Sequence, residues 1–422
     1  MATPPEEGPG TPLPSAQRPL RIAHITGFGY MAGGAERGTK LLCDALTARG
    51  HEVLVITTDA SVEGRERFAD VTVGSNTDGP FFTRLAHRSW NEGARAGIAR
   101  ALREFLPDVV HLHTTVQFGP SVLWSFGDLP AVLTVHGPEE FLLDLLPWLV
   151  PPSEYRSEPY EPGNLRWQGW LRYGYLRLIQ RRLYRPGLRR LRAVLVQSDW
   201  MVDVVRRDVK GVPVIKRFGG CPLPPPEPLG PGLEVLSVGR LGPFKGVDVL
   251  IQAMAHVVAK VPGAHLTVVG EGVAREGLVG LARRLGLSDA VTFAGWVSSG
   301  DLLPFYQAAR VVVVPSTIPE NLNRTALEAL ATGRPVVGTN LGGLLEQVAN
   351  GITGYLVPPR QPAVMAAAIT RILSDPELAS AMAEAAPPSV QPFGMATCVD
   401  RLELLYREVA SPQPAAARDP GP

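Results

Sequence analysis

Short apolar runs alternate along the chain with longer segments in which apolar residues recur at helical spacing. The run 20–26 (LRIAHIT) is followed by a glycine-rich turn and then by a helix-like segment with apolar residues at Leu41, Leu42, Ala45 and Leu46. Such short continuous runs are typical of strands that are buried on both faces, as in a parallel sheet. The alternation predicts parallel βαβ units in a doubly wound α/β fold.

This pattern occurs once in each half of the chain. In the first half it predicts a helix near 94–105 and strands at 20–26, 52–57, 109–112, 131–135 and 194–197. In the second half it predicts strands at 234–238, 265–269, 291–294, 311–314 and 335–338. The helices expected between them span 247–260, 275–285, 302–309 and 325–331, and a final helix spans 395–409.

Proline residues mark the boundaries between these regions. Six of the 41 prolines lie in 1–20, six in 222–231 and four in 411–422. A segment so poor in backbone N–H donors cannot lie inside a sheet, so 222–231 is the expected linker. We therefore predict a disordered leader at 1–19, an N-terminal domain at 20–217, a linker at 218–232, a C-terminal domain at 233–392, a crossover helix at 393–410 and a disordered tail at 411–422.

Charge and cysteine content argue against several classes of protein. The 41 basic and 40 acidic residues give a net charge of +1, which argues against a general nucleic-acid binder. The three cysteines are widely spaced, which fits a reducing cytoplasm better than a metal site or a disulfide framework. The sequence contains no apolar signal-peptide core and no run of 18 apolar residues, so we expect a cytoplasmic protein.

The segment 311–359 carries the most specific motif. A buried strand ends in a polar loop with Glu320, and Glu328 follows eight positions later on the next helix. The free N–H groups at the start of such a helix attract an anion such as a diphosphate, and carboxylates accept hydrogen bonds from sugar hydroxyls. Two glutamates at this spacing are usually surface residues, but the flanking strands and the Gly342-Gly343 turn favour a binding site.

A pair of cations lies at the end of another predicted strand. Arg240 follows Gly239 directly after the strand 234–238, and Lys245 comes five residues later. Two cations at the carboxyl end of a strand suit a diphosphate leaving group, because they neutralise the charge that builds as its bond breaks. A solvated loop pair is the alternative. It is weakened because the chain contains only five lysines.

With these motifs the chain resembles the GT-B-fold retaining glycosyltransferases of family 4, related to glycogen synthase and sucrose synthase. The resemblance rests on the E-x7-E signature from Glu320 to Glu328, followed by GRPVVGTNLGG and NGITGYLVPP, and it extends from about residue 21 to 409. It implies two Rossmann-like doubly wound domains that face each other across a cleft, with the C-terminal helix crossing back to the N-terminal domain. It also implies a nucleoside diphosphate sugar as donor, a hydroxyl acceptor and no metal or other cofactor, and the sequence has no D-x-D motif.

The resemblance assigns a role to each matching residue. Cations hold the diphosphate, Glu328 the ribose, and Glu320 the donor sugar, while His136 at a strand end approaches the reaction centre. The candidate catalytic residues are Glu320, Arg240, Lys245 and His136. The candidate donor-binding residues are Gly33, Gly34, Gly239, Gly270, Glu271, Val297, Asn321, Leu322, Asn323, Arg324, Thr325 and Glu328. Among them, Gly270, Glu271 and Val297 lie near the positions at which the family brackets the nucleobase. Gly33-Gly34 as a plain turn and His136 as a structural histidine remain alternatives, and for His111 and His113 we favour a structural role.

Two segments depart from the family pattern. Before the linker, where many relatives have an Asn-Gly-x-Asp loop, 214–228 reads VIKRFGGCPLPPPEP. After Glu320, where relatives often have Gly-Phe-Gly, the chain has Asn321-Leu322-Asn323, which opens the choice of donor to an uncommon sugar. The first departure concerns the hinge and the acceptor, and the second concerns the donor sugar.

A strongly basic segment lies between Arg166 and Arg192, with nine arginines, no acidic residue and several interleaved aromatic residues. Such a segment can dock on the anionic inner face of a membrane or grip an acidic acceptor. A solvated cationic helix face is the third interpretation.

The sequence as a whole predicts a retaining, metal-independent glycosyltransferase that moves a sugar from a UDP- or GDP-sugar to a hydroxyl of a small-molecule, secondary-metabolite or cell-envelope glycan acceptor. The alternatives are a glycolipid or exopolysaccharide glycosyltransferase at the inner membrane surface and a nucleotide-sugar epimerase of the same fold. A dehydrogenase is disfavoured because 27–32 lacks the required glycine pattern. A non-catalytic sugar-nucleotide-binding subunit is disfavoured because both cations and both glutamates are present. The sequence does not predict an oligomeric state.

Overall fold

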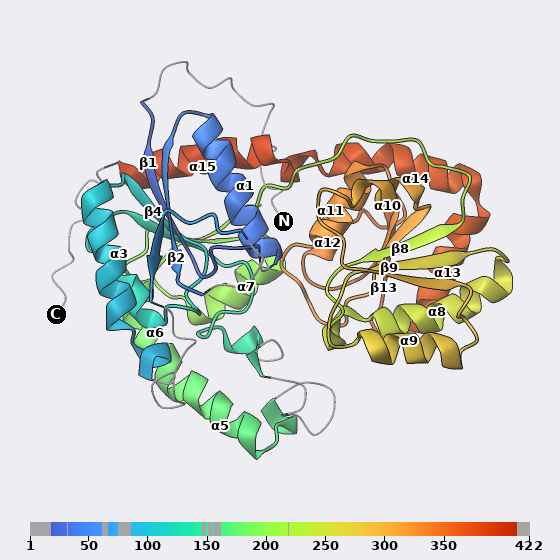
Figure 1. Ribbon diagram of the computed structural model, residues 1–422, viewed down its shortest axis with the longest axis horizontal. Helices are drawn as coiled ribbons and strands as arrows, with labels where there is room; N and C mark the ends of the chain where they lie inside the picture. The colour runs from blue at the N-terminus through green and yellow to red at the C-terminus, as the bar shows by residue number, and fades with distance from the viewer. Residues whose placement is uncertain are drawn as a thin grey trace, which may run out of the picture.

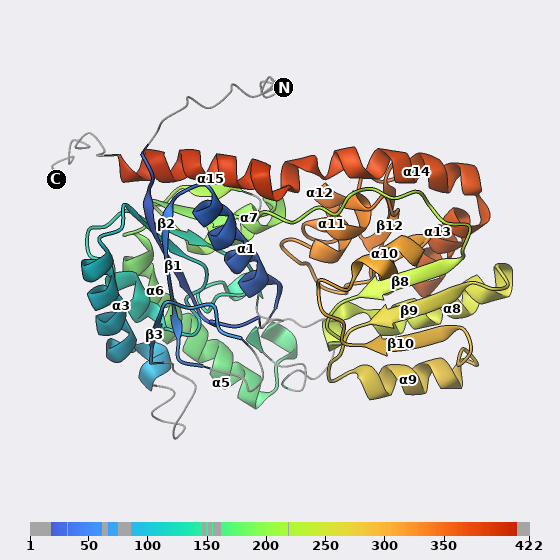
Figure 2. The same ribbon diagram turned by 45° about the horizontal axis from the view of Figure 1, so that its top comes forward.

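The computed structural model describes residues 18–31, 33–60, 66–74, 86–145, 149, 150, 154, 162–217 and 219–411. Two α/β units lie side by side, and a pair of helices runs along one edge of both (Figures 1 and 2). Residues 1–17 of the predicted leader and 412–422 of the predicted tail lie outside the described residues.

In the described part of the N-terminal domain, seven parallel strands form one sheet in the order β3-β2-β1-β4-β5-β6-β7. The strand order reverses direction between β1 and β4, which is where doubly wound domains place their ligands. The strands are β1 (Arg21–Thr26), β2 (Glu52–Thr58), β3 (Val71–Val73), β4 (Val109–Leu112), β5 (Ala131–Thr134), β6 (Ala193–Val196) and β7 (Val214–Lys216).

The described C-terminal domain repeats this plan with six parallel strands in the order β10-β9-β8-β11-β12-β13. Its switch point lies between β8 and β11. The strands are β8 (Glu234–Val238), β9 (His265–Val269), β10 (Val291–Gly295), β11 (Val311–Val314), β12 (Val336–Thr339) and β13 (Gly354–Val357).

Helices cover both faces of each sheet (Figure 1). In the N-terminal domain they are α1 (Gly34–Ala48), α3 (Glu92–Phe105), η1 (Pro120–Trp124), η2 (Leu143–Leu145), η4 (Pro162–Asn164), α5 (Trp167–Tyr175), the π-type turn η5 (Leu176–Gln180), α6 (Arg181–Leu188) and α7 (Asp199–Asp208). In the C-terminal domain they are η6 (Pro243–Lys245), α8 (Val247–Lys260), α9 (Arg275–Arg284), α10 (Leu303–Ala308), α11 (Arg324–Ala331), α12 (Leu344–Gln347), α13 (Pro362–Ser374) and α14 (Pro376–Ser389), followed by η7 (Gln391–Phe393) and α15 (Met395–Ala410).

The strands form because their side chains are buried on both faces of a covered sheet. All four residues of β4, β5, β6 and β11 are buried, which explains why these strands are almost entirely apolar, with His111 and Thr134 as the exceptions. The predicted bounds of β4, β8, β9 and β11 are confirmed. The short strands β3, β7 and β13 and the helices α13 and α14 were missed by the hydrophobic pattern.

The predicted crossover helix is confirmed. α14 runs along one edge of the C-terminal domain, and α15 continues along the same edge onto the N-terminal domain (Figure 2). Tyr406 and Val399 of α15 join a buried cluster with Ile22 of β1 and Leu46 of α1. The last helix in the sequence thus completes the core of the first domain.

Arg334 fastens the proline-rich segment to the C-terminal domain. Residues 222–230 have no regular secondary structure, as their missing N–H groups predict. The buried guanidinium of Arg334 donates to the carbonyl oxygens of Glu227 and Pro228 in this segment and to those of Tyr306 and Gln307 in α10. The segment is therefore held at a fixed path.

Candidate active site

A cavity of about 460 Å³ lies between the two domains, at the carboxyl ends of both sheets. The N-terminal domain contributes residues that follow β1, β5 and β6, and the C-terminal domain contributes residues that follow β8 and β11. Most of the predicted site residues line this cavity: Gly33, Gly34, His136, Gly239, Arg240, Lys245, Glu320, Asn321, Leu322, Asn323, Arg324 and Thr325. The predicted residues Gly270, Glu271, Val297 and Glu328 lie outside the lining.

Glu320 forms the polar centre of the cavity on the side of the C-terminal domain. Lys245 Nζ donates to Glu320 Oε2 at 2.6 Å, and the hydroxyl of Ser316 donates to Oε1. Both charged side chains are partly exposed to the cavity, so this ion pair is accessible to a ligand. A diphosphate can compete for Lys245, which would release the Glu320 carboxylate to accept hydrogen bonds from sugar hydroxyls.

Two glycines shape the loop that carries Glu320. Gly342 has a φ of +54°, and a Cβ there would lie 2.4 Å from the Glu320 carbonyl oxygen. A Cβ on Gly343 would lie 2.0 Å from the carbonyl oxygen of Asn321, and Gly343 N donates to Glu320 O at 2.8 Å. The Gly342-Gly343 turn thus supports the loop from behind, since any larger residue would displace it.

The helix α11 begins directly after this loop. Asn323 caps it, because its Oδ1 accepts from Ala326 N at 3.0 Å. The start of α11 lines the cavity through Arg324 and Thr325, so the positive end of the helix dipole faces it. Arg240 and Lys245 lie in the same cavity, which gives it the character of an anion site.

Glu328 lies one turn further along α11 and is only 6% exposed. Its Oε1 accepts from Arg37 Nη1 of α1 at 3.1 Å, and its Oε2 accepts from the Tyr306 hydroxyl at 2.9 Å. Burial and the neighbouring carboxylate raise the pKa of Tyr306 well above its usual value. The second glutamate of the signature is therefore bonded to both domains in this structure.

The nucleobase prediction falls on residues beside the cavity. A Cβ on Gly270 would lie 1.9 Å from the Gly239 carbonyl oxygen, so this glycine lets the ends of β9 and β8 pack closely. Glu271 Oε1 lies 3.2 Å from Arg275 Nε in an ion pair. The role of Gly270, Glu271 and Val297 in base binding stays a prediction.

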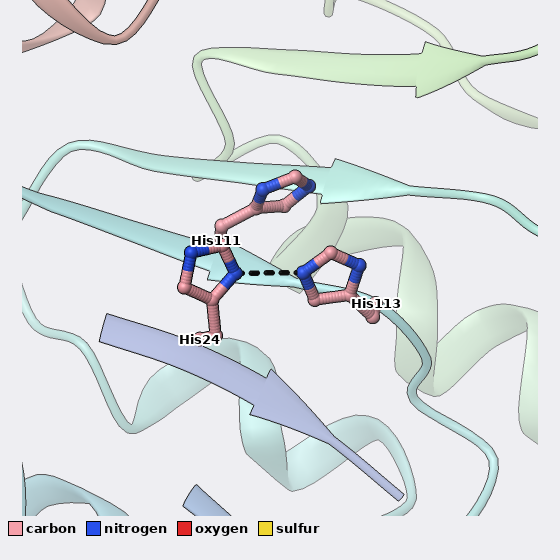
Figure 3. A group of neighbouring side chains, drawn as sticks. All are labelled: His24, His111 and His113. Carbon is pink, nitrogen blue, oxygen red and sulfur yellow. Dashed lines mark hydrogen bonds between the residues drawn. The ribbon is translucent and has the colours of Figure 1, made fainter. Parts of the chain in front are cut away.

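His136 ends a chain of buried histidines. His24 Nδ1 lies 2.8 Å from His113 Nε2, as Figure 3 shows, and His113 Nδ1 lies 3.0 Å from His136 Nε2. Burial lowers the pKa of His24 to about 3, and burial together with Arg324 lowers the pKa of His136 to about 4. At neutral pH His136 therefore faces the cavity as an uncharged group. The structural role favoured for His113 agrees with these contacts.

Among the described residues, one group has the proximity of a metal site: His24, His111 and His113, whose candidate ligand atoms lie within 4.8 Å of one another. Two nitrogen ligands of one tetrahedral zinc ion stand roughly 3.3 Å apart at a Zn–N distance of about 2.05 Å. The 2.8 Å contact between His24 and His113 is shorter and fits a hydrogen bond. His111 bonds instead to the hydroxyls of Thr134 and Tyr406. This spacing fits a hydrogen-bonded network better than a metal cage.

Sequence reasoning missed the contacts that join the two domains. Asn321 hydrogen-bonds to residues at the ends of β5 and β6. Glu346 of α12 accepts from Asp199 N at 2.6 Å and from Lys216 Nζ at 2.9 Å. The ion pair between Arg37 and Glu328 is a third contact between the two domains. Partners so far apart along the chain leave no local signal in the sequence.

Comparison with known proteins gives a consistent result. Residues 32–217 match the family model Glycosyltransferase Family 4, and residues 228–388 match the model Glycosyl transferases group 1. A D-inositol 3-phosphate glycosyltransferase from Frankia alni is 32% identical over 409 residues, which cover 91% of this chain and 97% of that protein. The glycogen synthase of Mycobacterium tuberculosis strain H37Rv is 29% identical over 377 residues, covering 84% and 86%.

Solved structures share the fold across nearly the whole chain. The sucrose-phosphate synthase of Thermosynechococcus elongatus aligns with a TM-score of 0.70 and 24% identity, over 92% of this chain and 99% of that one. The Anabaena protein HepE in complex with UDP aligns with a TM-score of 0.67 and 20% identity, over 92% and 100%.

Proposed function

The chain belongs to the family 4, group 1 glycosyltransferases, and on this premise we propose that it is a retaining, metal-independent enzyme that transfers a sugar from a nucleoside diphosphate to a hydroxyl acceptor. The observation that carries the proposal is the interdomain cavity. There Arg240, Lys245 and Glu320 of one domain face His136 and the Gly33-Gly34 turn of the other. Cationic groups and hydrogen-bonding groups thus share one cavity, which supports a nucleoside diphosphate sugar as donor.

The donor would occupy the C-terminal side of the cavity. Its diphosphate would contact Arg240, Lys245 and the free N–H groups at the start of α11. Because Lys245 now pairs with Glu320, the diphosphate would replace the carboxylate as the partner of the lysine. Glu320 would then accept hydrogen bonds from the hydroxyls of the sugar.

The reaction would break the bond between the anomeric carbon and the phosphate oxygen and form a bond from the same carbon to the acceptor oxygen. The electron pair of the broken bond stays on the diphosphate, where the two cations and the helix dipole stabilise it. The leaving phosphate oxygen would take the acceptor proton on the same face of the sugar, which retains the configuration. His136, as a neutral group, can hydrogen-bond to the sugar without adding positive charge beside the developing cation.

We infer a UDP- or GDP-sugar as donor and a hydroxyl on a small molecule, a secondary metabolite or a cell-envelope glycan as acceptor. UDP is supported because the structurally similar HepE binds it. A polar acceptor is supported by the relative whose name specifies inositol 3-phosphate. The acceptor would enter from the N-terminal side, where Gln197, Trp200 and Met201 line the cavity.

Release of nucleoside diphosphate from a panel of UDP- and GDP-sugars, with candidate acceptors, tests the proposal. The variant Glu320→Gln keeps the shape and removes the charge, and Glu384→Gln makes the same change at an exposed position of α14. We expect loss of turnover in the first and wild-type turnover in the second, with EDTA having no effect on the wild type. Wild-type turnover by Glu320→Gln would refute the site assignment, and an epimerised nucleotide sugar as product would favour the epimerase alternative.

We also propose that the helical segment from α5 to α6 contacts an anionic membrane surface. Trp167, Trp170 and Leu171 lie on one face of α5 by their spacing, and Trp167 and Leu171 are 68% and 66% exposed. Arg182 and Arg185 of α6 are exposed further along the same segment. Exposed apolar and aromatic groups beside cations suit the interface of an anionic bilayer. None of the described helices combines the length and the apolar character that a bilayer-spanning segment needs.

Co-sedimentation with vesicles tests this contact. We expect the protein to pellet with vesicles of phosphatidylglycerol and phosphatidylcholine and to remain in solution with phosphatidylcholine alone. The double variant Trp167→Gln/Leu171→Gln should lose pelleting, while Leu404→Gln, at an exposed apolar position on α15, should keep it. Absence of pelleting by the wild type would refute the membrane contact and favour a solvated cationic face.

A further inference from the structure

The side chain of Asn321 belongs to the C-terminal domain but bonds to the N-terminal domain. Its Nδ2 donates to the carbonyl oxygen of Val135 at 2.8 Å. Its Oδ1 accepts from the hydroxyl of Ser198 at 2.9 Å and from the backbone N–H of Gln197 at 3.3 Å. The residue is only 5% exposed, so these bonds form away from bulk water. Its two amide atoms are thus committed to the opposite domain.

The position of these bonds along the chain links the two halves of the cavity. Asn321 directly follows Glu320, and Val135 directly precedes His136. Glu320 and His136 line the cavity from opposite domains. The bond from Asn321 Nδ2 to Val135 O therefore lies one residue away from each, and it sets how the two side chains face each other.

Both ends of this connection are packed against neighbouring backbone or regular structure. On the C-terminal side, a Cβ on Gly343 would lie 2.0 Å from the Asn321 carbonyl oxygen, so the loop backbone rests directly on the Gly342-Gly343 turn. On the N-terminal side, Val135 follows β5, and Ser198 caps α7 by accepting from Met201 N at 3.3 Å. Because neither end is a mobile loop tip, the amide transmits position from one domain to the other.

The chemistry of the contact requires an amide. The Val135 carbonyl needs a donor, whereas the Ser198 hydroxyl and the Gln197 N–H need an acceptor. Asparagine supplies both from one side chain. Aspartate would keep the acceptor but would place an oxygen against the Val135 carbonyl oxygen, and alanine would leave the three groups without their partner.

We propose that Asn321 is a positioning residue that closes the two domains in one register, so that Glu320 and His136 engage the donor together. The inference deepens the proposed function and rests on it. It predicts that changes to Asn321 affect sugar transfer and nucleotide binding differently. Nucleotide binding depends on groups of the C-terminal domain and stays intact without the bond, whereas transfer depends on both domains and slows.

The test compares Asn321→Asp and Asn321→Ala with the control Asn340→Asp, which makes the same change at an exposed position outside the cavity. We expect kcat for transfer to fall about tenfold or more in both Asn321 variants, which equals about 1.4 kcal/mol. The Kd for UDP, measured by calorimetry, should stay within about twofold of the wild type. Wild-type kcat in both variants, or a loss of UDP affinity equal to the loss of kcat, would overturn the proposal.

Small-angle scattering separates this inference from the proposed function, because it needs no turnover. We expect the substrate-free Asn321 variants to have a larger radius of gyration than the wild type, and the control to match the wild type. The double variant Ser198→Ala/Asn321→Ala should have a radius of gyration little larger than that of Asn321→Ala alone. Both changes remove the same contact, the bond between Ser198 and Asn321. Unchanged scattering in both Asn321 variants would overturn the inference, even if nucleotide sugars are turned over. If the wild type turns over no nucleotide sugar but the variants expand, only the proposed function fails.

Discussion

Arg37 of the N-terminal domain donates from Nη1 to Glu328 Oε1 of the C-terminal domain at 3.1 Å, across 291 positions of the chain. The Glu328 carboxylate is buried and also accepts from Tyr306, so both of its oxygens have a donor before any ligand arrives. If Glu328 holds a ribose, as the family resemblance implies, the ribose hydroxyls would compete with these partners for the carboxylate oxygens. Arg37 is the candidate to leave, because it belongs to the opposite domain, whereas Tyr306 belongs to the same domain as Glu328.

The variant Arg37→Met should therefore bind UDP more tightly than the wild type, by about two- to fivefold, since its Glu328 lacks one donor that the ribose can supply. Glu328→Gln should bind UDP about tenfold more weakly, because a neutral amide accepts a weaker hydrogen bond than a carboxylate. Calorimetric titration with UDP measures both. Equal UDP affinity in all three proteins would show that Glu328 does not touch the ribose and that its contact with Arg37 is structural.

Lys245→Met should reduce transfer about 10²- to 10³-fold, a typical effect of removing one group that stabilises transition-state charge. The reason is that, in the proposed complex, the lysine would exchange Glu320 for the diphosphate as its partner. Initial rates at saturating donor measure the effect, and Lys260→Met, at the exposed end of α8, is the matched control. A change in donor KM alone, with kcat unchanged, would assign Lys245 to ground-state binding and not to the chemical step.

The apolar pattern predicted most of the fold because parallel strands under helices are buried on both faces. β11 is fully buried, and its four valines could hardly belong to any other environment. The same logic missed β3 and β7, since three-residue edge strands with partly exposed side chains carry too little pattern. Local periodicity therefore identifies central strands better than edges.

The sequence likewise predicts some residues of the candidate site and not others. Glu320 and Lys245 could be predicted because each lies in the segment that follows a strand, and strand ends in this fold meet at one edge. The role of Asn321 could not be predicted, because Val135 is 186 positions away and an asparagine in a loop is common. The sequence interpretation took Asn321 as a sign of an uncommon donor sugar, whereas its amide is bonded to the opposite domain.

The buried histidines predict how stability depends on pH. Burial lowers the pKa of His24 from 6.5 to about 3, so between these values the unfolded chain binds a proton that the folded chain does not. Stability therefore rises with pH through this window and is fully present above about pH 6.5. We expect His24→Asn to show a smaller fall in melting temperature between pH 7 and pH 5 than the wild type. His256→Gln, an exposed position of α8, is the control and should match the wild type.

His24→Asn must be compared with the wild type, because other groups titrate between pH 5 and pH 7. Burial raises the pKa of Glu139 to about 7, so its contribution falls as pH rises and opposes that of the histidines. This contribution is common to the wild type and the variant, and the difference between them isolates His24. An equal fall in melting temperature between pH 7 and pH 5 in His24→Asn and the wild type would contradict the assignment of His24 as a buried neutral group.

Arg334 should be required for the fold of the C-terminal domain and not for its chemistry. The guanidinium is 1% exposed and donates to carbonyl oxygens of the proline-rich segment and of α10, at distances that include 2.9 Å to Tyr306 O and 2.8 Å to Gln307 O. Lysine cannot reproduce this fork, because its ammonium is a point donor on a flexible stem. Arg334→Lys should therefore lose about 2 kcal/mol or more of unfolding free energy, since buried carbonyls are left without donors.

Urea titration measures the loss, with Arg284→Lys at the exposed end of α9 as the control. The protein that remains folded should keep wild-type UDP affinity. A stable Arg334→Lys protein would show that the segment is held by its own packing and that the buried cation is dispensable.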